Sequence, residues 1–187
     1  MSDNFKLNKI DDNEILRLFR DKKSEKVAFE HLVNNYKKIL YHHIRRIVEN
    51  HDDTDDVLQN TFIKIYENIK FFREDSKLYT WIYRIATNEA LNFIKNKKVR
   101  NLYINTISEK YSEQQTEIQS IDGENIQKIL KFAIDQLPEK QKIVFYLRYY
   151  EELKYEDISE ILGTSVGALK ASYHIAVKKI EEILTRN

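Results

Sequence analysis

Cysteine, proline and glycine are almost missing from this sequence of 187 residues, which has no cysteine, one proline and three glycines. Sandwiches and barrels of many short strands need glycine and proline in their turns, so this scarcity argues against an all-β fold. A chain without cysteine has neither a disulfide framework nor a thiolate metal site, which is typical of a reducing compartment. The composition therefore predicts an all-α protein.

Long apolar runs are also missing. The longest strictly apolar stretches, such as IVFYL at Ile143 to Leu147, fall far short of the about 20 residues that span a bilayer. The N-terminal sequence MSDNFKLNKIDDNE has no apolar segment of the kind found in signal peptides. We therefore expect a cytoplasmic protein with no membrane insertion of its own.

The sequence also has no large excess of either charge. Thirty-one Lys and Arg stand against 30 Asp and Glu, a net charge of +1, so the whole molecule is not a polycation that would coat DNA. The charges are nevertheless segregated along the chain. Acidic residues cluster at 49–56 and 151–160, and basic residues at 84–100 and 163–180. Two basic segments in a near-neutral chain predict two local contacts with an anion such as nucleic acid.

Apolar residues recur at steps of three and four through most of the chain, which predicts helices. We expect helices at 24–49, 76–99, 155–162 and 165–184. A further helix should begin after an N-cap at Asp52 or Thr54. Pro138 should occupy the first position of another helix. The segment 101–122 is rich in Asn, Ser, Thr, Gln and Glu and has no sustained apolar period, so it is the natural linker. The predicted fold is two small helical domains joined by a flexible linker.

The segment EILGTSVGALKASYHIAVKKIEEIL, Glu160 to Leu184, holds two of the three glycines. Gly163 directly follows an expected helix that ends at Leu162, and Ser165 is a good cap for the next helix. A helix, a tight glycine turn and a capped second helix form the pattern of a helix-turn-helix.

The second helix of this pair has two different sides. The apolar side is Val166, Leu169, Tyr173, Ala176, Ile180 and Ile183. The opposite side is small, polar and basic, with no acid before Glu181: Gly167, Lys170, His174 and Lys178, flanked by Ala168, Ala171 and Ser172. This side predicts a DNA contact, and the alternative is an ordinary helical hairpin. Gly167 has two interpretations that can both hold: clearance for a phosphate at the helix N-terminus, or close packing between helices.

A second polar stripe without acids lies in the segment from Arg73 to Arg100. Its members are Lys77, Thr80, Arg84, Asn88, Asn92 and Lys95, and beside them stand Tyr79, Trp81 and Tyr83, with Phe71 and Phe72 in the preceding loop. Cationic and amide groups interleaved with aromatic rings suit a single nucleic-acid strand, because phosphates attract charge and unstacked bases need flat surfaces. Aromatic residues on helices are more often part of a core, which is the alternative here.

Together these segments resemble the sigma-70 family of bacterial transcription initiation factors, in its small extracytoplasmic-function group. The resemblance covers about 28–100 and 126–183. DDVLQNTFIKIYENI resembles the family's core-polymerase-binding segment, FFREDSKLYTWIYRIATNEALNFIK its −10 element reader, and LPEKQKIVFYLRYYEELKYEDISEILGTSVGALKASYHIAVKKI its fourth region. The resemblance implies a region 2 domain at 1–100, a linker at 101–122 and a region 4 helix-turn-helix domain at 123–187.

The resemblance also implies roles for individual residues. The polymerase-binding residues would be Asp56, Gln59, Asn60, Phe62 and Lys64, with Asn60 in place of the usual acidic residue. The residues that recognise and melt the −10 element would be Phe72, Lys77, Tyr79, Trp81, Arg84, Asn88, Asn92 and Lys95. The residues that face the −35 element would be Ser165, Val166, Gly167, Lys170, Ala171, His174 and Lys178. Ser172, Ile175 and Val177 stand where many relatives carry arginine, which weakens the phosphate grip.

The partners implied are core RNA polymerase, an anti-sigma factor, and promoter DNA that is double-stranded at the −35 element and melted at the −10 element. The linker acids Glu109, Glu113 and Glu117 either mimic nucleic acid in the RNA path of the polymerase or only solvate the linker.

No catalytic or metal-binding pattern is visible in the sequence. The acids at 52–56 lack the glycine of a calcium loop, and the adjacent His42 and His43 point to different helix faces, so they do not form a ligand pair. There is no phosphate loop or nucleophile elbow, so we expect no enzyme activity, metal or cofactor. Two other classes remain open: a DNA-binding regulator that works without polymerase, and a protein-interaction module such as an anti-sigma-like decoy.

Overall fold

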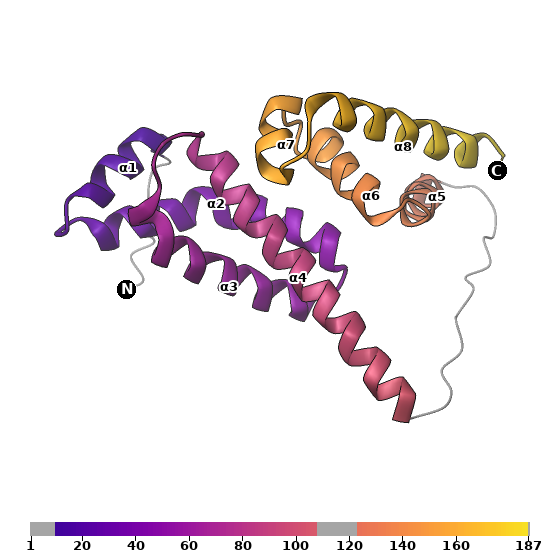
Figure 1. Ribbon diagram of the computed structural model, residues 1–187, viewed down its shortest axis with the longest axis horizontal. Helices are drawn as coiled ribbons and strands as arrows, with labels where there is room; N and C mark the ends of the chain where they lie inside the picture. Colours follow the sequence, from indigo (N-terminus) through magenta and orange to yellow (C-terminus); the bar gives the residue numbers. More distant parts are fainter. Residues whose placement is uncertain (1–9, 108–122, 187) are drawn as a thin grey trace. The chain divides into compact units, whose positions relative to one another are not determined.

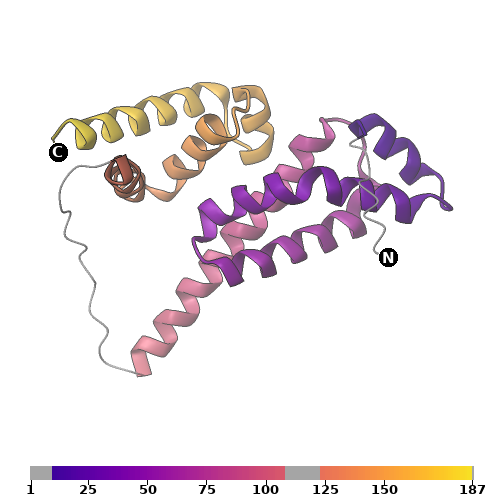
Figure 2. The same cartoon turned by 180° about the vertical axis from the view of Figure 1, so that it is seen from behind.

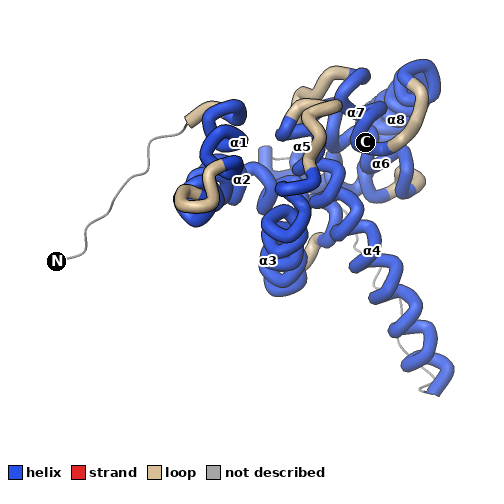
Figure 3. Tube along the Cα trace, turned by 60° about the vertical axis from the view of Figure 1, so that its left-hand side comes forward, coloured by secondary structure: helices blue, strands red, loops and turns tan. Residues whose placement is uncertain are grey.

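The computed structural model describes residues 10–107 and 123–186, and every regular element in these two ranges is a helix or helical turn (Figures 1 and 3). The predicted all-α fold is confirmed. Contacts divide the chain into two compact units, Met1–Lys95 and Asn96–Asn187. None of the helices in the described ranges is long and apolar enough to cross a membrane.

Unit 1 contains α1 (Asp12–Arg20), α2 (Glu25–Val48), α3 (His51–Asn68), the short 3-10 helix η1 (Ile69–Phe71) and most of α4 (Leu78–Ile107). α2 packs against both α1 and α3 (Figure 2). The core of this unit is aliphatic, and its fully buried members include Ile15, Leu32, Leu40, Ile44, Ile65 and Ile82.

Helix α1 does not appear among the sequence predictions. Asp11 caps it by accepting a hydrogen bond from the Glu14 N–H at 2.9 Å. The hydroxyl of Tyr36 on α2 donates to the Asp12 carboxylate at 2.7 Å, and the Asn35 amide donates to the Ile10 carbonyl at 2.7 Å. These polar contacts from α2, together with the buried Ile15, are what hold so short a helix in place.

The start of α3 differs from the prediction. The N-cap is Asn50, whose side chain accepts a hydrogen bond from the Asp53 N–H at 3.0 Å, rather than Asp52 or Thr54. Asp52 and Asp53 lie instead in the first turn, where carboxylates stabilise the positive end of the helix dipole. The helix can begin this early because Glu49 ends α2 in the left-handed conformation, with φ of 66°.

Helix α4 continues to Ile107, beyond the expected end near Val99. The first residues of the expected linker, 101–107, are therefore helical. The rest of that segment, with Glu109, Glu113 and Glu117, lies outside the described residues. The predicted domain limits remain a prediction.

Unit 2 contains α5 (Gly123–Asp135), α6 (Glu139–Phe145), the π-helical turn η2 (Tyr146–Tyr150), α7 (Tyr155–Leu162) and α8 (Val166–Arg186). α8 lies alongside α5, α6 and α7 and closes the core of this unit (Figure 1). Pro138 is the N-cap of α6, one residue before the predicted position. Gly163 ends α7 with φ of 62°, the left-handed turn that the helix-turn-helix pattern predicts.

Candidate nucleic-acid interface

The two sides of α8 are arranged as predicted. Leu169, Ala176 and Ile180 are buried, whereas Val166, Tyr173 and Ile183 are partly exposed at the margin of the core. The opposite side consists of the exposed Gly167, Lys170, Ala171, His174 and Lys178. Ser165 precedes the helix and its hydroxyl accepts from the Ala168 N–H at 3.4 Å. The predicted DNA-facing side of α8 is therefore open to solvent within unit 2.

The structure separates the two interpretations of Gly167. A Cβ built at this position meets no heavy atom of the described chain within 4 Å, so no neighbouring helix requires a glycine here. Gly163 also has open space, but its positive φ is a conformation that other residues adopt only with strain. Close packing against a neighbouring helix therefore does not explain Gly167.

Lys170 lies against an aromatic ring. Its ammonium group is 5.7 Å from the centroid of Tyr155, and the guanidinium of Arg148 is 5.1 Å from the same centroid. Arg148 also donates a hydrogen bond to the Leu153 carbonyl at 2.9 Å. Sequence reasoning missed Arg148, because nothing in the segment YLRYY indicates that its guanidinium and Lys170 share one ring. Tyr155 therefore contacts both cations.

The polar stripe of α4 is exposed at Lys77, Arg84, Asn88, Asn92 and Lys95. Thr80 does not belong to it, since its exposed fraction is 1%. At 3.6 residues per turn, Thr80 lies at the edge of the stripe and is carried inward with Tyr83 and Thr87, which are both buried.

Aromatic rings surround the start of α4. The rings of Phe72 and Trp81 are 5.2 Å apart, and the Lys77 ammonium is 5.5 Å from the Tyr79 ring. Phe71 is 70% exposed, the largest exposure among the large apolar side chains of the described residues. Tyr83 is different: it is buried, and its ring lies 5.1 Å from that of His43. Tyr83 is therefore part of the core, whereas Phe71 is exposed and Phe72 and Trp81 are partly exposed.

The loop between η1 and α4 is tied to α1. Arg20, the last residue of α1, forms an ion pair with Glu74. Glu74 has φ of 60°, a left-handed conformation that is uncommon for a residue other than glycine. Sequence reasoning could not find this contact because it joins residues 54 positions apart.

A buried histidine connects α2 to α4 beneath the stripe. His43 Nε2 lies 2.9 Å from Thr87 Oγ1, and that hydroxyl donates its one hydrogen to the Tyr83 carbonyl at 2.7 Å. Nε2 must therefore carry a hydrogen and donate to Thr87. Burial, assisted by the charge of Arg46, lowers the pKa of His43 to about 3. The ring is thus a neutral part of the core.

Four of the five predicted polymerase-binding residues are exposed on α3: Asp56, Gln59, Asn60 and Lys64. The ammonium of Lys64 also pairs with Glu89 of α4 at 2.5 Å. Phe62 lies elsewhere, because its exposed fraction is only 9% and its ring packs edge-on against Phe29 at 6.4 Å. Phe62 therefore supports this surface of α3 from the core.

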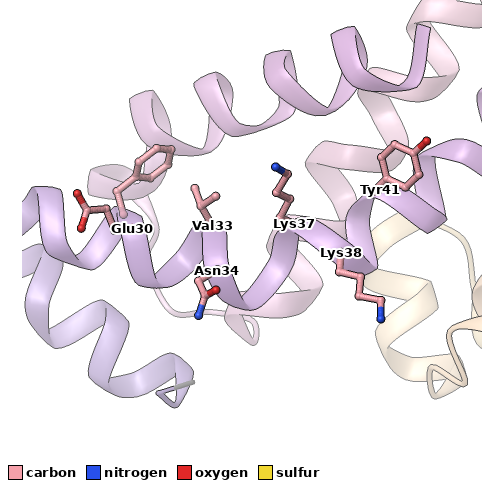
Figure 4. A pocket seen from close by; sticks show the side chains of 7 residues that line it. Glu30, Val33, Asn34, Lys37, Lys38 and Tyr41 are labelled. Atoms are coloured by element: carbon pink, nitrogen blue, oxygen red, sulfur yellow. The ribbon is translucent and has the colours of Figure 1, made fainter. Parts of the chain in front are cut away.

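Apolar side chains that the sequence analysis did not select lie beside these residues. Ile63 and Tyr66 on α3 are 47% and 44% exposed, and the ring of Tyr66 is 4.9 Å from that of Phe29 on α2. From Phe29 onward, α2 lines an open groove with Glu30, Val33, Asn34, Lys37, Lys38 and Tyr41 (Figure 4). In Figure 4, Val33 and Lys37 point to one side of α2, and Asn34 and Lys38 to the other.

The described residues contain no group of three or more His, Cys, Asp or Glu side chains that could hold a metal ion. One helical unit thus carries a helix-turn-helix whose outer side is basic, and the other carries a cationic stripe with aromatic rings beside it. The comparisons with known proteins make this more specific. The profile described as Sigma-70 region 2 matches residues 32–100, and that described as Sigma-70, region 4 matches residues 127–180.

The ECF RNA polymerase sigma-E factor of Haemophilus influenzae is 33% identical over 171 residues, which cover 87% of this chain and 90% of the relative. SigW, an ECF RNA polymerase sigma factor of Bacillus subtilis, is 32% identical, with coverage of 84% and 89%. Among solved structures, the sigma factor RpoE in complex with the anti-sigma factor NepR from Bartonella quintana shares the fold. Its TM-score is 0.66 at 22% identity, over 84% of this chain and 96% of that one. This chain belongs to the sigma-70 family, in its extracytoplasmic-function group.

Proposed function

We propose that this chain binds core RNA polymerase and directs it to promoters by recognising a −35 element and by recognising and melting a −10 element. The observation that carries the proposal is the presence, on one chain, of sigma regions 2 and 4, each with an exposed helix side that is cationic and free of acids. Sigma factors are initiation factors and not catalysts, so the chemistry of RNA synthesis belongs to the polymerase.

The −10 element would be held by α4 and the loop before it. Lys77, Arg84 and Lys95 are exposed cations that can follow the phosphates of a single strand. Phe71 and the Phe72–Trp81 pair provide flat apolar surfaces for unstacked bases. The amides of Asn88 and Asn92 are exposed on the same side and can donate to and accept from base edges.

The −35 element would be read as a duplex by α8. Its side of Gly167, Lys170, Ala171, His174 and Lys178 enters the major groove, and the turn at Ser165 and Val166 approaches the backbone. A missing side chain at Gly167 lets the N-terminus of the helix approach a phosphate. Arg148 adds a second cation next to Lys170 through their shared contact with Tyr155.

Polymerase would dock on the exposed side of α3. Asp56, Gln59, Asn60 and Lys64 supply polar contacts, and Ile63 and Tyr66 supply apolar area at the same surface. Interfaces of this mixed kind owe most of their affinity to a few apolar and aromatic residues. Phe62 would act through its packing against Phe29, which fixes the positions of the two helices.

An anti-sigma factor is a further proposed partner. The sigma factor of the Bartonella quintana structure is bound to one, and a second structure that shares the fold is CnrH in complex with the cytosolic domain of CnrY. The TM-score of this second structure is 0.68, at 18% identity.

Since polymerase and promoter DNA are in the bacterial cytoplasm, we place the function of this chain there.

Runoff transcription with core polymerase on genomic fragments tests the proposal. We expect discrete transcripts that require this chain, and their 5′ ends locate the promoters. A DNA-binding regulator that works without polymerase would instead bind the same fragments specifically on its own and yield no transcript. A decoy would bind polymerase tightly and open no promoter.

A further inference from the structure

Ile175 is a large apolar residue on a helix side that is otherwise polar and small. It is 52% exposed, more than any other large apolar side chain described in unit 2 except Tyr149, which is equally exposed. It follows Gly167 and Ala171 at intervals of four residues, so the three positions lie in one row along α8. Ala176, the next residue, is fully buried, so the core of unit 2 is already closed beneath this row.

The surroundings of Ile175 limit what it can contact. The two members of the row that precede it, Gly167 and Ala171, are small, so they leave its side chain open. Lys170, His174 and Lys178 flank the row, and no acid precedes Glu181. A charge distribution of this kind attracts the phosphates of a duplex and brings the row against the floor of the major groove.

The chemistry of the side chain then selects its partner in the groove. Isoleucine has no hydrogen-bonding group, so it cannot read the donors and acceptors of guanine, cytosine or adenine. The apolar group that base pairs present in the major groove is the C5-methyl of thymine. Contact with a purine edge would leave acceptors without a partner, which is unfavourable.

We infer that Ile175 selects thymine at one position of the −35 element through contact with its C5-methyl group. The small residues Gly167 and Ala171 in the same row allow α8 to come close enough for this contact. The inference rests on the proposed function, because it requires that α8 reads the −35 element. It goes further by assigning a base preference to a residue.

Uracil substitution tests the inference, because uracil differs from thymine only by the missing methyl group. A promoter fragment obtained by runoff transcription is resynthesised with one thymine at a time replaced by deoxyuridine across the upstream element. Binding by the holoenzyme formed with the full chain is then measured. We expect a loss of about fourfold at one position, which corresponds to about 0.8 kcal/mol for one methyl group.

Variants distinguish Ile175 from the rest of the surface. Ile175→Ala should abolish the difference between thymine and uracil at that position, and Ile175→Val should keep most of it. Leu184→Ala is the matched control, since Leu184 is also exposed on α8, at 38%, but lies beyond the residues matched to region 4. This control should keep the full effect of uracil. Because Ile175 is half exposed, none of these changes should alter the thermal unfolding of the chain appreciably.

Equal binding to thymine and uracil at every upstream position would overturn the inference, as would an unchanged uracil effect in Ile175→Ala. Either result would leave the proposed function intact, because transcription would still depend on the chain. Absence of any polymerase-dependent transcript would instead contradict the proposed function itself.

Discussion

At the scale of single residues, His42 and His43 are neighbours in the sequence, yet His42 is exposed and His43 is fully buried. The two glycines of the helix-turn-helix also differ, since Gly163 has a positive φ and Gly167 lies within a helix. Each pair offers a comparison between a structural residue and a matched neighbour.

The first residue-scale prediction concerns His43 and pH. The folded state keeps the ring neutral down to its lowered pKa of about 3, whereas the unfolded chain protonates it near 6.5. Between these values the unfolded state binds more protons, so His43 makes the unfolding free energy rise with pH by up to about 1.4 kcal/mol per unit. Urea unfolding at pH 4.5, 5.5 and 6.5 measures the slope.

His43→Gln should have a shallower slope than the wild type over this interval, and the exposed control His42→Gln should match the wild type. Comparing slopes removes the contribution of the carboxylates, which titrate in all three proteins. Identical slopes for His43→Gln and the wild type would show that His43 is not the group responsible.

The second residue-scale prediction compares the two glycines. Gly163→Ala places a Cβ on a residue with φ of 62° and should lower stability by about 1–2 kcal/mol. Gly167→Ala has no such strain and should stabilise α8 by up to about 1 kcal/mol, yet weaken −35 binding. Thermal unfolding and holoenzyme binding to promoter DNA measure the two effects. Loss of stability in Gly167→Ala would mean that its glycine is needed for folding.

At the scale of elements, α3 and α4 present two different surfaces within unit 1. α3 exposes Asp56, Gln59, Ile63 and Tyr66, whereas α4 exposes a row of cations and amides. An ion pair between Lys64 and Glu89 joins α3 to α4, and a hydrogen bond between His43 and Thr87 joins α2 to α4. Because the surfaces belong to different helices, substitutions on them should separate the two activities.

Asn88→Ala and Gln59→Ala form the test of this separation. Both side chains are exposed, so neither change should affect folding. Losing a hydrogen bond to a base should reduce promoter opening by Asn88→Ala up to about tenfold with polymerase affinity unchanged, and Gln59→Ala should do the reverse. Permanganate reactivity of the −10 region reports opening, and competition with another sigma factor reports polymerase affinity.

The two variants would contradict the assignment if they affected both measurements equally. Phe62→Ala is a poor probe of the surface, because removing a buried ring that packs on Phe29 destabilises unit 1 by about 3–5 kcal/mol. Ile63→Ala, at a residue that is 47% exposed, is a better apolar probe.

At the scale of the whole molecule, the net charge of +1 limits the affinity of the free chain for DNA. The sides of α4 and α8 proposed to face DNA carry only a few cations each, so each helix offers only a few phosphate contacts. Each such contact contributes about one unit to the slope of log affinity against log salt. A chain with these properties depends on polymerase to bring both surfaces to the promoter.

We therefore predict weak, salt-sensitive binding of the free chain to promoter duplexes. When core polymerase holds both surfaces at once, binding should be tighter by about 100-fold or more. Electrophoretic or fluorescence titrations at several salt concentrations, with and without polymerase, measure this difference. Specific binding of equal strength by the free chain would favour a regulator that acts without polymerase.

Much of the fold could be predicted from the sequence, for local physical reasons. Apolar residues at steps of three and four predicted the helices and the two sides of α8, since a helix face is set by the 3.6-residue period alone. Helix α7 and the turn at Gly163 were predicted for the same kind of reason, because capping and left-handed conformations depend on adjacent residues.

Only the tertiary structure decided where residues at the edge of a stripe point and which distant groups meet. Thr80 is buried although the sequence places it in the polar stripe, and the start of α1 is held by Tyr36 and Asn35 of α2. The contacts of Lys170 with Tyr155 and of Arg20 with Glu74 likewise join separate elements. A local period sets the direction of a side chain within its helix, but burial and partners depend on the packing of elements that are far apart in the chain.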